Sequence, residues 1–568
     1  MTLLSLGIAG AIAAAPQAVQ ADPLAPLPQT QMQASQPVAP LQPAVPVPKD
    51  WRGVFAAIRT GNWAAARAGI ASLPPGVLTA VAKAELYTAK DSPTVDLARL
   101  QALIAEAPEL PDADQLARMA ISRGATGPAL IYQERATVSL GSAPGRYRAR
   151  PVSGEPAADA LREQLQPLVE ANSAAEAEAA YIAQMPYLSA NARAEAAQRV
   201  AWIYYVIGDD FNARRAADYG RIGAGGEWGS QAAWVSGLAS WRLGDCQSAS
   251  RAFRDVGTSA TQRELSAAGY YWAARAEQAC RRPQNVQPLL KAAAASPESF
   301  YGLIARETLG TVTRLPQPAR VSTASVDGLP NVRRAAELTA IGERSLAERM
   351  LKHQARIGSP ADHAALLEVA KRLDLAGAQF WLATNGQPGA RVQAADRYPM
   401  PQWAPVRGWR VEPALAFAHA IQESSFQLGA VSPAGAVGLL QVRPGTASDM
   451  AAAAGLPYSS SALYDPRYNL EFGQSFIERL RSSSATGAQL PKVIASYNAG
   501  PVPVGRWAYI QDKGDPILWI ESVPYWETRY YVPAVMRNLW VYEGLGNRPS
   551  PSLTALAQHR WPAFPSAR

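Results

Sequence analysis

The alternation of apolar and polar positions along the chain predicts an almost entirely helical protein. Between Asp50 and about Gly310, amphipathic segments of roughly 12 to 18 residues follow one another, separated by Gly-Asp, Pro-Gly or Ser-Pro turns. Apolar residues recur there at the spacing of a helix with one buried face. The pattern therefore predicts helical hairpins, each made of two helices joined by a short turn.

A weak internal repeat runs through these hairpins. The segment AWIYYVIGDDFNARRAA, starting at Ala201, resembles GLASWRLGDCQSASRAF, starting at Gly237, at an offset of 36 residues. Hairpin repeats of the tetratricopeptide kind have a period of about 34 residues, and each hairpin must stack on its neighbours to bury its apolar face. We therefore expect residues 50–312 to form an α-superhelical domain, with Gly208 and Gly244 in structural turns.

Three further segments follow the repeats. Residues 313–397 contain two long helical patterns after a Pro-bearing bend, and we interpret them as a helical linker domain. An irregular stretch with prolines and tryptophans opens residues 398–546, which carry the chemistry described below. Residues 547–568 form a tail without a clear pattern, either a loose extension or a segment that packs back on the body.

The first residues of the chain predict export. Their apolar run is too short to cross a membrane comfortably and ends in Ala-Val-Gln-Ala, a plausible cleavage site, so we assign residues 1–21 to a signal peptide. No Lys or Arg precedes this run, which departs from the usual pattern. No cysteine follows it, so we expect no lipid anchor there. Residues 22–49 are rich in Pro and Gln and lack aromatic residues, which is typical of a linker.

The amino-acid composition favours helix and argues against nucleic acid as a partner. Of the 568 residues, 48% are apolar and only 18% charged, with several alanine runs that favour helix. At roughly 150 residues per domain, the length fits three or four domains. The net charge of +8 is spread along the chain, which suits an ordinary basic protein or one adapted to an anionic polymer. Without a Lys/Arg-rich patch or a binding motif, nucleic acid is not an expected partner.

Cysteines and histidines do not form a metal-binding pattern. Cys246 and Cys280 are 34 residues apart, and the four histidines are scattered, so we expect no metal site and no cofactor. Export would permit a disulfide between the two cysteines, while two buried free thiols remain the alternative. Any catalysis must then rest on carboxylates, hydroxyls and the backbone.

One stretch from Val411 to Ala447 concentrates the candidate chemistry. Pro413 suits the first turn of a helix, and the apolar run that follows leads into Glu423 in the last turn. A helix C-terminus and apolar surroundings both disfavour a carboxylate, so both raise its pKa, as a general acid requires. The alternative is an ordinary exposed glutamate at a helix end.

Four ordered motifs carry a family resemblance. Glu-Ser at Glu423, Gly-Leu-x-Gln ending at Gln441, Tyr-Asn-Ala-Gly from Tyr497 and Glu-Thr-Arg from Glu527 resemble the soluble lytic transglycosylases of bacteria over about residues 410–545. The resemblance implies a mainly α fold: a ring-like superhelix, a helical linker domain and a lysozyme-like catalytic domain. It implies non-hydrolytic cleavage of the β-1,4 bond between N-acetylmuramic acid and N-acetylglucosamine in peptidoglycan, giving 1,6-anhydro-muropeptides during cell-wall turnover.

The resemblance also implies a location, partners and residue roles. The enzyme would be periplasmic, act on peptidoglycan glycan strands, and have cell-wall synthesis or secretion machinery as further candidate partners. Glu423 would be the sole catalytic residue, first an acid and then a base, with the substrate N-acetyl group stabilising charge at C1. Sugar-binding positions or positions that orient the acid would be Ser424, Ser432, Leu440, Gln441, Tyr497, Asn498 and Glu527.

Several alternatives stay open at these positions. Tyr497 is expected to hydrogen-bond Glu423 or the N-acetyl group, or, with Asn498, merely to cap a helix. Glu527 binds substrate or water, or pairs with Arg529. Glu521 is the more structural of the two glutamates. At Leu440 the family commonly has Met, and we expect this volume-conserving change to alter a sugar subsite subtly.

Two other functions compete with transglycosylation. A true muramidase would admit water and want a second carboxylate near C1, for which Glu527 is the candidate. A helical-repeat scaffold with an inactive lysozyme-like domain would bind glycan or cell-wall enzymes. The intact Glu423 argues against the scaffold.

Overall fold

The computed structural model describes residues 46–565, which form helices and two short strands. The predicted signal peptide, residues 1–21, and nearly all of the predicted linker, residues 22–49, lie outside this described part. Between the two ends, the helices fall into groups that share hydrophobic cores.

The first group contains five helices of nine or ten residues each. They are α1 (Trp51–Arg59), α2 (Trp63–Ser72), α3 (Thr79–Thr88), α4 (Leu97–Glu106) and α5 (Ala113–Ser122). Folded structure begins where the sequence predicts it, because the Asp50 side chain accepts a hydrogen bond from Gly53 N and so caps α1.

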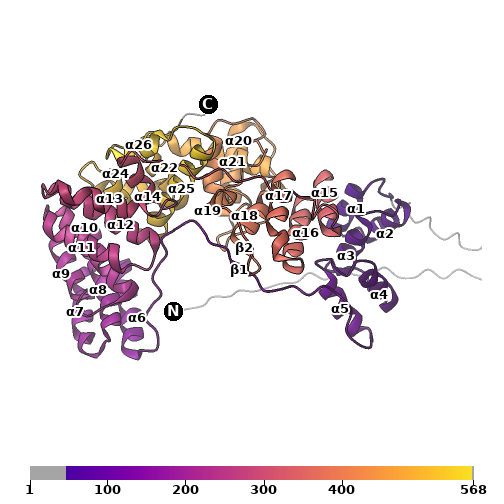
Figure 1. The fold of residues 1–568 in the computed structure, drawn as a ribbon, viewed down its shortest axis with the longest axis horizontal. Helices are drawn as coiled ribbons and strands as arrows, with labels where there is room; N and C mark the ends of the chain where they lie inside the picture. The colour runs from indigo at the N-terminus through magenta and orange to yellow at the C-terminus, as the bar shows by residue number, and fades with distance from the viewer. Residues whose placement is uncertain (1–45, 566–568) are drawn as a thin grey trace, which may run out of the picture. The chain divides into compact units, whose positions relative to one another are not determined.

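The second group is a series of helices in which neighbours along the chain pack side by side (Figure 1). They are α6 (Pro156–Glu170), α7 (Ala174–Gln184), α8 (Ala190–Ile207), α9 (Asp210–Tyr219), α10 (Gly226–Arg242), α11 (Cys246–Ser259), α12 (Arg263–Ala279), α13 (Val286–Ala294) and α14 (Phe300–Thr308). The predicted Gly-Asp turns are confirmed: Gly208 ends α8 with φ of 88°, and Asp209 caps α9. A disulfide joins Cys246 to Cys280, one of the two alternatives left open above.

The third group corresponds to the predicted linker domain. It comprises α15 (Pro330–Ala340), α16 (Arg344–Ile357), α17 (His363–Arg372) and α18 (Ala376–Thr384). Its buried side chains form one core with those of α1 to α5, whereas α6 to α14 belong to another core. The expected domain 50–312 therefore consists of two groups with separate cores, because the buried side chains of α1 to α5 cluster with those of helices much later in the chain.

An extended segment, residues 123–155, connects α5 to α6, and we call it the strap. Its strand β1 (Val138–Ser139) pairs antiparallel with β2 (Asn385–Gly386), with Val138 opposite Gly386. Farther on, Tyr147 N donates to Gln262 Oε1 at 3.0 Å. The strap thus satisfies backbone groups by bonds to β2, after α18, and to the Gln262 side chain, before α12.

The remaining helices make up the predicted catalytic region. They are α19 (Pro413–Glu423), α20 (Pro444–Ala454), α21 (Pro466–Arg481), α22 (Leu490–Ala499), α23 (Pro501–Arg506), α24 (Pro516–Ser522), α25 (Trp526–Leu545) and α26 (Pro551–Ala557). The short 3-10 helices of the chain are η1 (Met185–Tyr187), η2 (Pro283–Asn285), η3 (Pro360–Asp362), η4 (Ala394–Arg397), η5 (Ser460–Tyr464) and η6 (Trp507–Tyr509). Of the two possibilities for the tail, the structure has the second: α26 packs on α14, with Leu553 and Leu556 buried.

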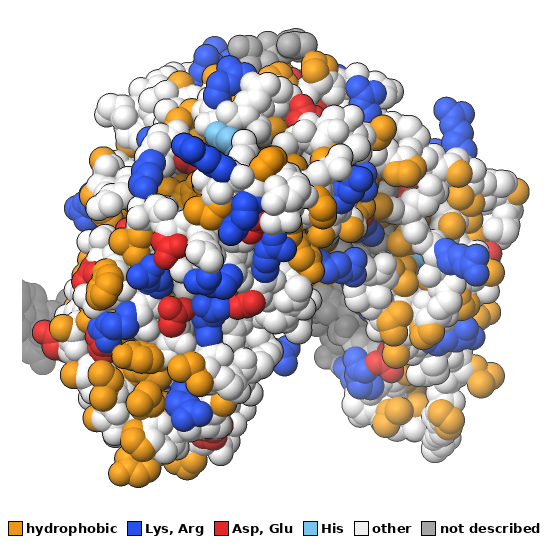
Figure 2. Space-filling view, turned by 60° about the vertical axis from the view of Figure 1, so that its left-hand side comes forward, with side chains coloured by type: hydrophobic (Ala, Val, Ile, Leu, Met, Phe, Trp, Pro, Cys, Tyr) orange, Lys and Arg blue, Asp and Glu red, His pale blue; other side chains and the backbone are white. Residues whose placement is uncertain are grey.

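The positive charge is dispersed over the visible surface, as the sequence predicts. On the face shown in Figure 2, Lys and Arg side chains lie at many separate places, several of them beside Asp or Glu. Within residues 46–565, no helix combines the length and the apolar character needed to cross a membrane.

Candidate active site

Glu423 is the last residue of α19, a helix buried along nearly its whole length. Pro413 occupies its first turn, where the missing N–H costs nothing, and residues 414–421 are all buried. Only at the end does the helix reach the surface: Gln422 is exposed and Glu423 half-buried. The helix therefore holds a carboxyl group rigidly at the boundary between core and solvent.

The surroundings of Glu423 favour the protonated acid. Burial raises its pKa from 4.5 to about 7, a hydrogen bond from Tyr531 acts in the opposite direction, and the charge of Glu527 raises the pKa further. Within the described residues, no Lys, Arg or His forms an ion pair with this carboxyl. The predicted increase in the pKa of Glu423 is therefore present, and no cation offsets it.

The hydrogen-bond partner of Glu423 comes from α25. The Tyr531 hydroxyl donates to Glu423 Oε1 and lies 2.7 Å from Nδ1 of His419, one turn earlier on α19. Burial raises the pKa of Tyr531 well above its usual value, as does the Glu423 charge, so Tyr531 keeps its proton. Glu423 thus faces a neutral donor.

This arrangement corrects one expectation. Tyr497 does not bond Glu423, because its hydroxyl donates to the backbone oxygen of Leu440 at 2.7 Å. Tyr497 sits near the end of α22, whereas Tyr531 is on the face of α25 that packs against α19. Tyr497 still lies close enough for the Glu423 charge to raise the Tyr497 pKa, in addition to the larger effect of burial.

Glu527 lies in the first turn of α25, one turn before Tyr531, and is exposed. Its negative charge is favourable at a helix N-terminus, the opposite of the situation of Glu423. The alternative pairing with Arg529 is not formed: Arg529 donates to Val523 O at 2.8 Å and stacks over Trp202 at 3.7 Å. Glu527 is therefore near Glu423 and open to solvent.

Asn498 is held beside Glu527. Its Oδ1 accepts a hydrogen bond from Thr528 Oγ1 at 2.5 Å, and the residue is half-buried. This contact links the end of α22 to the start of α25. The structure thus brings together Glu423, Tyr497, Asn498 and Glu527 of the predicted residues.

In the loop between α19 and α20, isolated β-bridges hold the predicted glycine-rich turn. Val437 forms antiparallel bridges with Val431 and Val442. Gly438 has φ of 78°, and a Cβ there would collide with the carbonyl of Leu463 and the amide of Asn469. The Gly in the Gly-Leu-x-Gln motif is therefore required by the backbone.

Asn469 of α21 fixes this loop from beneath. It is fully buried, accepts from Leu440 N at 2.8 Å and donates to Val437 O at 2.9 Å and Leu463 O at 2.8 Å. All three contacts are to backbone atoms that no helix satisfies. Asn469 thus fixes the loop that carries the predicted sugar-binding positions.

The loop residues named from the sequence use their polar groups mostly within the loop. Gln441 Nε2 donates to Gly438 O at 2.8 Å and Ala430 O at 3.1 Å. Ser432 Oγ accepts from Ala436 N at 3.0 Å. Both side chains are half-buried, so each has some surface left for a ligand.

Ser424 and Leu440 are placed differently from the expectation. Ser424 is buried, and its hydroxyl donates to Leu439 O at 2.7 Å. The Leu440 side chain has no exposed surface and packs against Gly473 of α21. Both residues support the loop from inside and do not present their side chains to a sugar.

Glu521 is structural, as expected. It is fully buried, pairs with Arg146 of the strap at 2.6 Å and accepts from the Tyr301 hydroxyl at 2.6 Å. Tyr205 of α8 contacts Ser522 at 2.8 Å in the same region. The strap and the repeat helices therefore fix α24 and the start of α25, on which Glu527 and Tyr531 depend.

Three residues of the site were missed from the sequence: Tyr531, His419 and Asn469. Tyr531 follows Glu527 at four residues, a spacing that puts both on one face of α25. That signal was available two residues after the Glu-Thr-Arg motif. His419 lies four residues before Glu423, the same spacing on α19, so the sequence carried a signal for it as well. Asn469 has no such signal, because it acts through contacts with distant segments.

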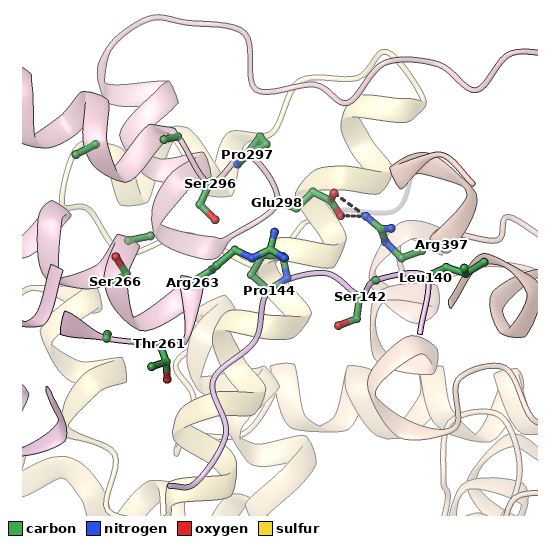
Figure 3. Close-up of a pocket in the computed structure, with 15 residues that line it drawn as sticks. Leu140, Ser142, Pro144, Thr261, Arg263, Ser266, Ser296, Pro297, Glu298 and Arg397 are labelled. Carbon is green, nitrogen blue, oxygen red and sulfur yellow. Dashed lines mark hydrogen bonds and ion pairs between the residues drawn. The ribbon is translucent and has the colours of Figure 1, made fainter. Parts of the chain in front are cut away.

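A separate cavity lies away from these residues. It has a volume of about 520 Å³ and is lined by the strap, the segments before α12 and α14, and Arg397. Figure 3 shows the ion pair of Glu298 and Arg397 at the edge of the cavity, and Arg263 of α12 in its lining. The two paired groups are 2.6 Å apart. None of the predicted site residues lines the cavity. Within residues 46–565, no cluster of three or more His, Cys, Asp or Glu could hold a metal ion.

Part of the region that holds these residues is similar to known proteins. Residues 404–520 match the family model of the Transglycosylase SLT domain. The chain is 26% identical over 275 residues to the soluble lytic murein transglycosylase of Escherichia coli (strain K12), covering 44% of this chain and 40% of that protein. It is 32% identical over 153 residues to a putative soluble lytic murein transglycosylase of Haemophilus influenzae, covering 26% of this chain and 25% of that protein. These alignments span less than half of the relatives' length.

Solved structures extend the similarity to the fold of most of the chain. The 70 kDa soluble lytic transglycosylase of Escherichia coli matches with a TM-score of 0.56 at 17% identity, covering 90% of this chain and 99% of that one. An inactive mutant of the lytic transglycosylase Slt from Pseudomonas aeruginosa matches with a TM-score of 0.52 at 17% identity, covering 90% and 88%. The expected mainly α fold is confirmed. Within it, residues 404–520 are similar to the Transglycosylase SLT domain.

Proposed function

We propose that this chain, through its SLT transglycosylase domain, is a lytic murein transglycosylase. The observation that carries the proposal is Glu423: a half-buried carboxyl group with a pKa of about 7, no cationic partner among the described residues and an uncharged donor at Oε1. A group with such a pKa can hold a proton at neutral pH and accept one back, which acid catalysis followed by base catalysis requires.

The reaction uses one carboxyl group twice. Glu423 gives its proton to the glycosidic oxygen as the bond from C1 of N-acetylmuramic acid breaks, and N-acetylglucosamine leaves. The resulting carboxylate then takes the proton of the C6 hydroxyl while that oxygen bonds to C1. The product is a 1,6-anhydro ring, and the enzyme returns to its protonated state without consuming water. The substrate N-acetyl group stabilises the positive charge at C1.

The other residues would bind and orient the glycan. Glu527 and Asn498 lie at the open side of α25 and α22, where their polar groups can reach sugar hydroxyls. Gln441 and Ser432 would contribute their remaining surface. Ser424 and Leu440 support the loop, and their contribution to binding would be indirect. We propose peptidoglycan strands as the substrate and the periplasm as the location, with cell-wall synthesis or secretion machinery as further partners.

Hydrolysis is the second candidate, and Glu527 is the observation in its favour. Its charge affects the pKa of Glu423, so the two carboxyl groups are close. Glycosidases that use water need such a second carboxylate. A muramidase would leave reducing ends, whereas a transglycosylase leaves none.

Mass spectrometry of peptidoglycan digests separates these functions. Wild type is expected to release anhydro-muropeptides, and Glu423→Gln to release none. Reducing-end products that disappear in Glu527→Gln would replace the proposal with hydrolysis. If folded wild type gives no soluble product, the proposal fails in favour of a glycan-binding scaffold.

A further inference from the structure

His419 lies directly behind the proposed catalytic carboxyl and has no part in the family motifs. It is on α19, four residues before Glu423, and its exposed fraction is 0%. Nδ1 lies 2.7 Å from the Tyr531 hydroxyl. Nε2 is buried and has no hydrogen-bond partner within the described residues.

The Tyr531 hydroxyl has two neighbours but only one proton. When Glu423 is a carboxylate it can only accept, so the Tyr531 proton must point to Oε1. The Tyr531 oxygen must then accept from His419, which requires the proton of the imidazole to be on Nδ1. In the other tautomer, with the proton on Nε2, both Nδ1 and Glu423 Oε1 would be acceptors, and the Tyr531 hydroxyl has only one proton to donate.

The protonation states of the other groups around Glu423 are compatible with one fixed direction of these hydrogen bonds, from His419 through Tyr531 to Glu423. Those facing it are Tyr531 and Glu527 from α25, Tyr497 from α22 and His419 from α19 itself. Burial lowers the pKa of His419 to about 3, so the ring is neutral. Both tyrosines remain protonated, because burial raises the pKa of each.

We propose that His419 is a positioning residue that fixes the direction of a hydrogen-bond chain from Nδ1–H through Tyr531 to Glu423 Oε1. Oε1 then always accepts, so Oε2 is the oxygen that carries the catalytic proton. Oε2 gives that proton to the glycosidic oxygen and receives the proton of the C6 hydroxyl. Tyr531 and His419 keep their own protons throughout. The part of the inference that concerns catalysis rests on the function proposed above.

The tautomer can be measured without any substrate. Full-length protein with ¹⁵N-labelled histidine gives signals from four residues, and His419→Asn identifies the signal of interest. We expect Nδ1 protonated and Nε2 unprotonated at pH 5 and pH 8 alike. A proton on Nε2, or a ring that becomes charged over this range, overturns the proposal.

Two substitutions of His419 then test the role in catalysis. Asn can place an amide N–H near the position of Nδ1, whereas Phe keeps the ring but has no donor. We expect His419→Phe to lower kcat about tenfold with little change in KM, since an orienting group accounts for part of an acid–base contribution of about 100-fold or more. The alkaline limb of the kcat/KM profile should move to higher pH, because the bond that favours ionised Glu423 weakens.

His419→Asn should recover most of the rate and the wild-type pH profile. His363→Gln is the matched control, since His363 is also buried but bonds Leu382 O at 2.7 Å, in the core formed by α15 to α18 with α1 to α5. Equal profiles for the Phe variant and wild type, or a folded Asn variant as impaired as Phe, contradict the proposal. Should the Phe variant not fold, the tautomer measurement still decides. Should wild type lack transglycosylase products, the proposed function fails while the tautomer result stands.

Discussion

Glu521 and Glu423 are two carboxyl groups of the same catalytic region, each bonded to a tyrosine, yet their surroundings differ in two respects. Glu521 is fully buried against Arg146, which neutralises it, and accepts from Tyr301. Glu423 has the tyrosine without a cation and reaches the surface. The Arg146 guanidinium holds Glu521 in a structural ion pair. Glu423 has no such partner among the described residues and can exchange a proton.

A third carboxyl group shows that a raised pKa is not sufficient. Burial raises the pKa of Glu264 to about 7, the same as Glu423. Glu264, however, is 3% exposed, and its oxygens accept from Phe300 N and Tyr301 N at the start of α14. Access to solvent therefore distinguishes Glu423 from Glu264, and the missing cation distinguishes it from Glu521.

The largest expected effect concerns the Glu521 pair. Glu521→Gln leaves Arg146 buried without its counter-ion, so the free energy of unfolding should fall by about 3–5 kcal/mol. Urea unfolding at pH 7 measures this loss. Replacing both residues, as Arg146→Met with Glu521→Gln, should cost less than Glu521→Gln alone. A loss below about 1 kcal/mol for the single variant would remove the distinction between the two carboxyl groups.

Glu423 should have the opposite effect on stability. Its pKa is near 4.5 in the unfolded chain and about 7 in the folded protein, so the folded state binds more protons between these values. Stability therefore falls as pH rises from about 4.5 to 7 and stays lower above pH 7. Glu423→Gln, which carries no charge, should be about 1–3 kcal/mol more stable than wild type at pH 8.

At pH 4 the advantage of Glu423→Gln should vanish, because both states of wild type are then largely protonated. Thermal unfolding at the two pH values checks this difference. An equal difference in stability at pH 4 and pH 8 would mean that packing, and not ionisation of Glu423, causes the difference between the variant and wild type.

Removal of the neutral donor gives a smaller change. Tyr531→Phe takes away a bond that favours ionised Glu423, so the pKa of Glu423 should rise further and the alkaline limb of kcat/KM should move to higher pH. We expect kcat to fall about tenfold, in line with a hydrogen bond to a charged group. Tyr497→Phe is the control: it removes a bond to Leu440 O and should leave that limb nearly in place.

The smallest effect is expected at Leu440, whose side chain faces Gly473 and not the acid. Leu440→Met restores the family residue and conserves volume, so stability should change by less than about 1.5 kcal/mol. Product yield and chain-length distribution of digests should match wild type. A clear change in either would mean that packing behind the loop, in addition to its polar groups, defines the site.

The sequence predicted the parts of this molecule that depend on neighbouring residues. Helices with Gly-Asp turns, the position of Glu423 at a helix end and its unfavourable charge all follow from local pattern. The bond from Tyr531 to Glu423 and the pairing of Arg146 with Glu521 do not, because they join segments far apart in the chain. Of the partners considered for Tyr497, Glu423 is therefore the one that Tyr531 bonds instead.

The division of the cores could not be predicted either. Periodicity shows that α1 to α5 each have an apolar face, but nothing local says that α15 to α18 cover it. A run of similar hairpins favours stacking on the next hairpin in sequence, which holds for α6 to α14. The strap interrupts that order after α5.

The shared core of α1 to α5 and α15 to α18 has a consequence for the time course of folding. Helices made first must wait until Pro330 and the residues after it have been synthesised before their apolar faces can be covered. Contacts of such long sequence separation form slowly, and the uncovered faces are open to aggregation meanwhile. Helices α6 to α14, made in between, can pack on one another as they emerge. Helices α1 to α5, although synthesised first, should thus be among the last to reach their native packing. They are also where we expect a holding chaperone to bind first.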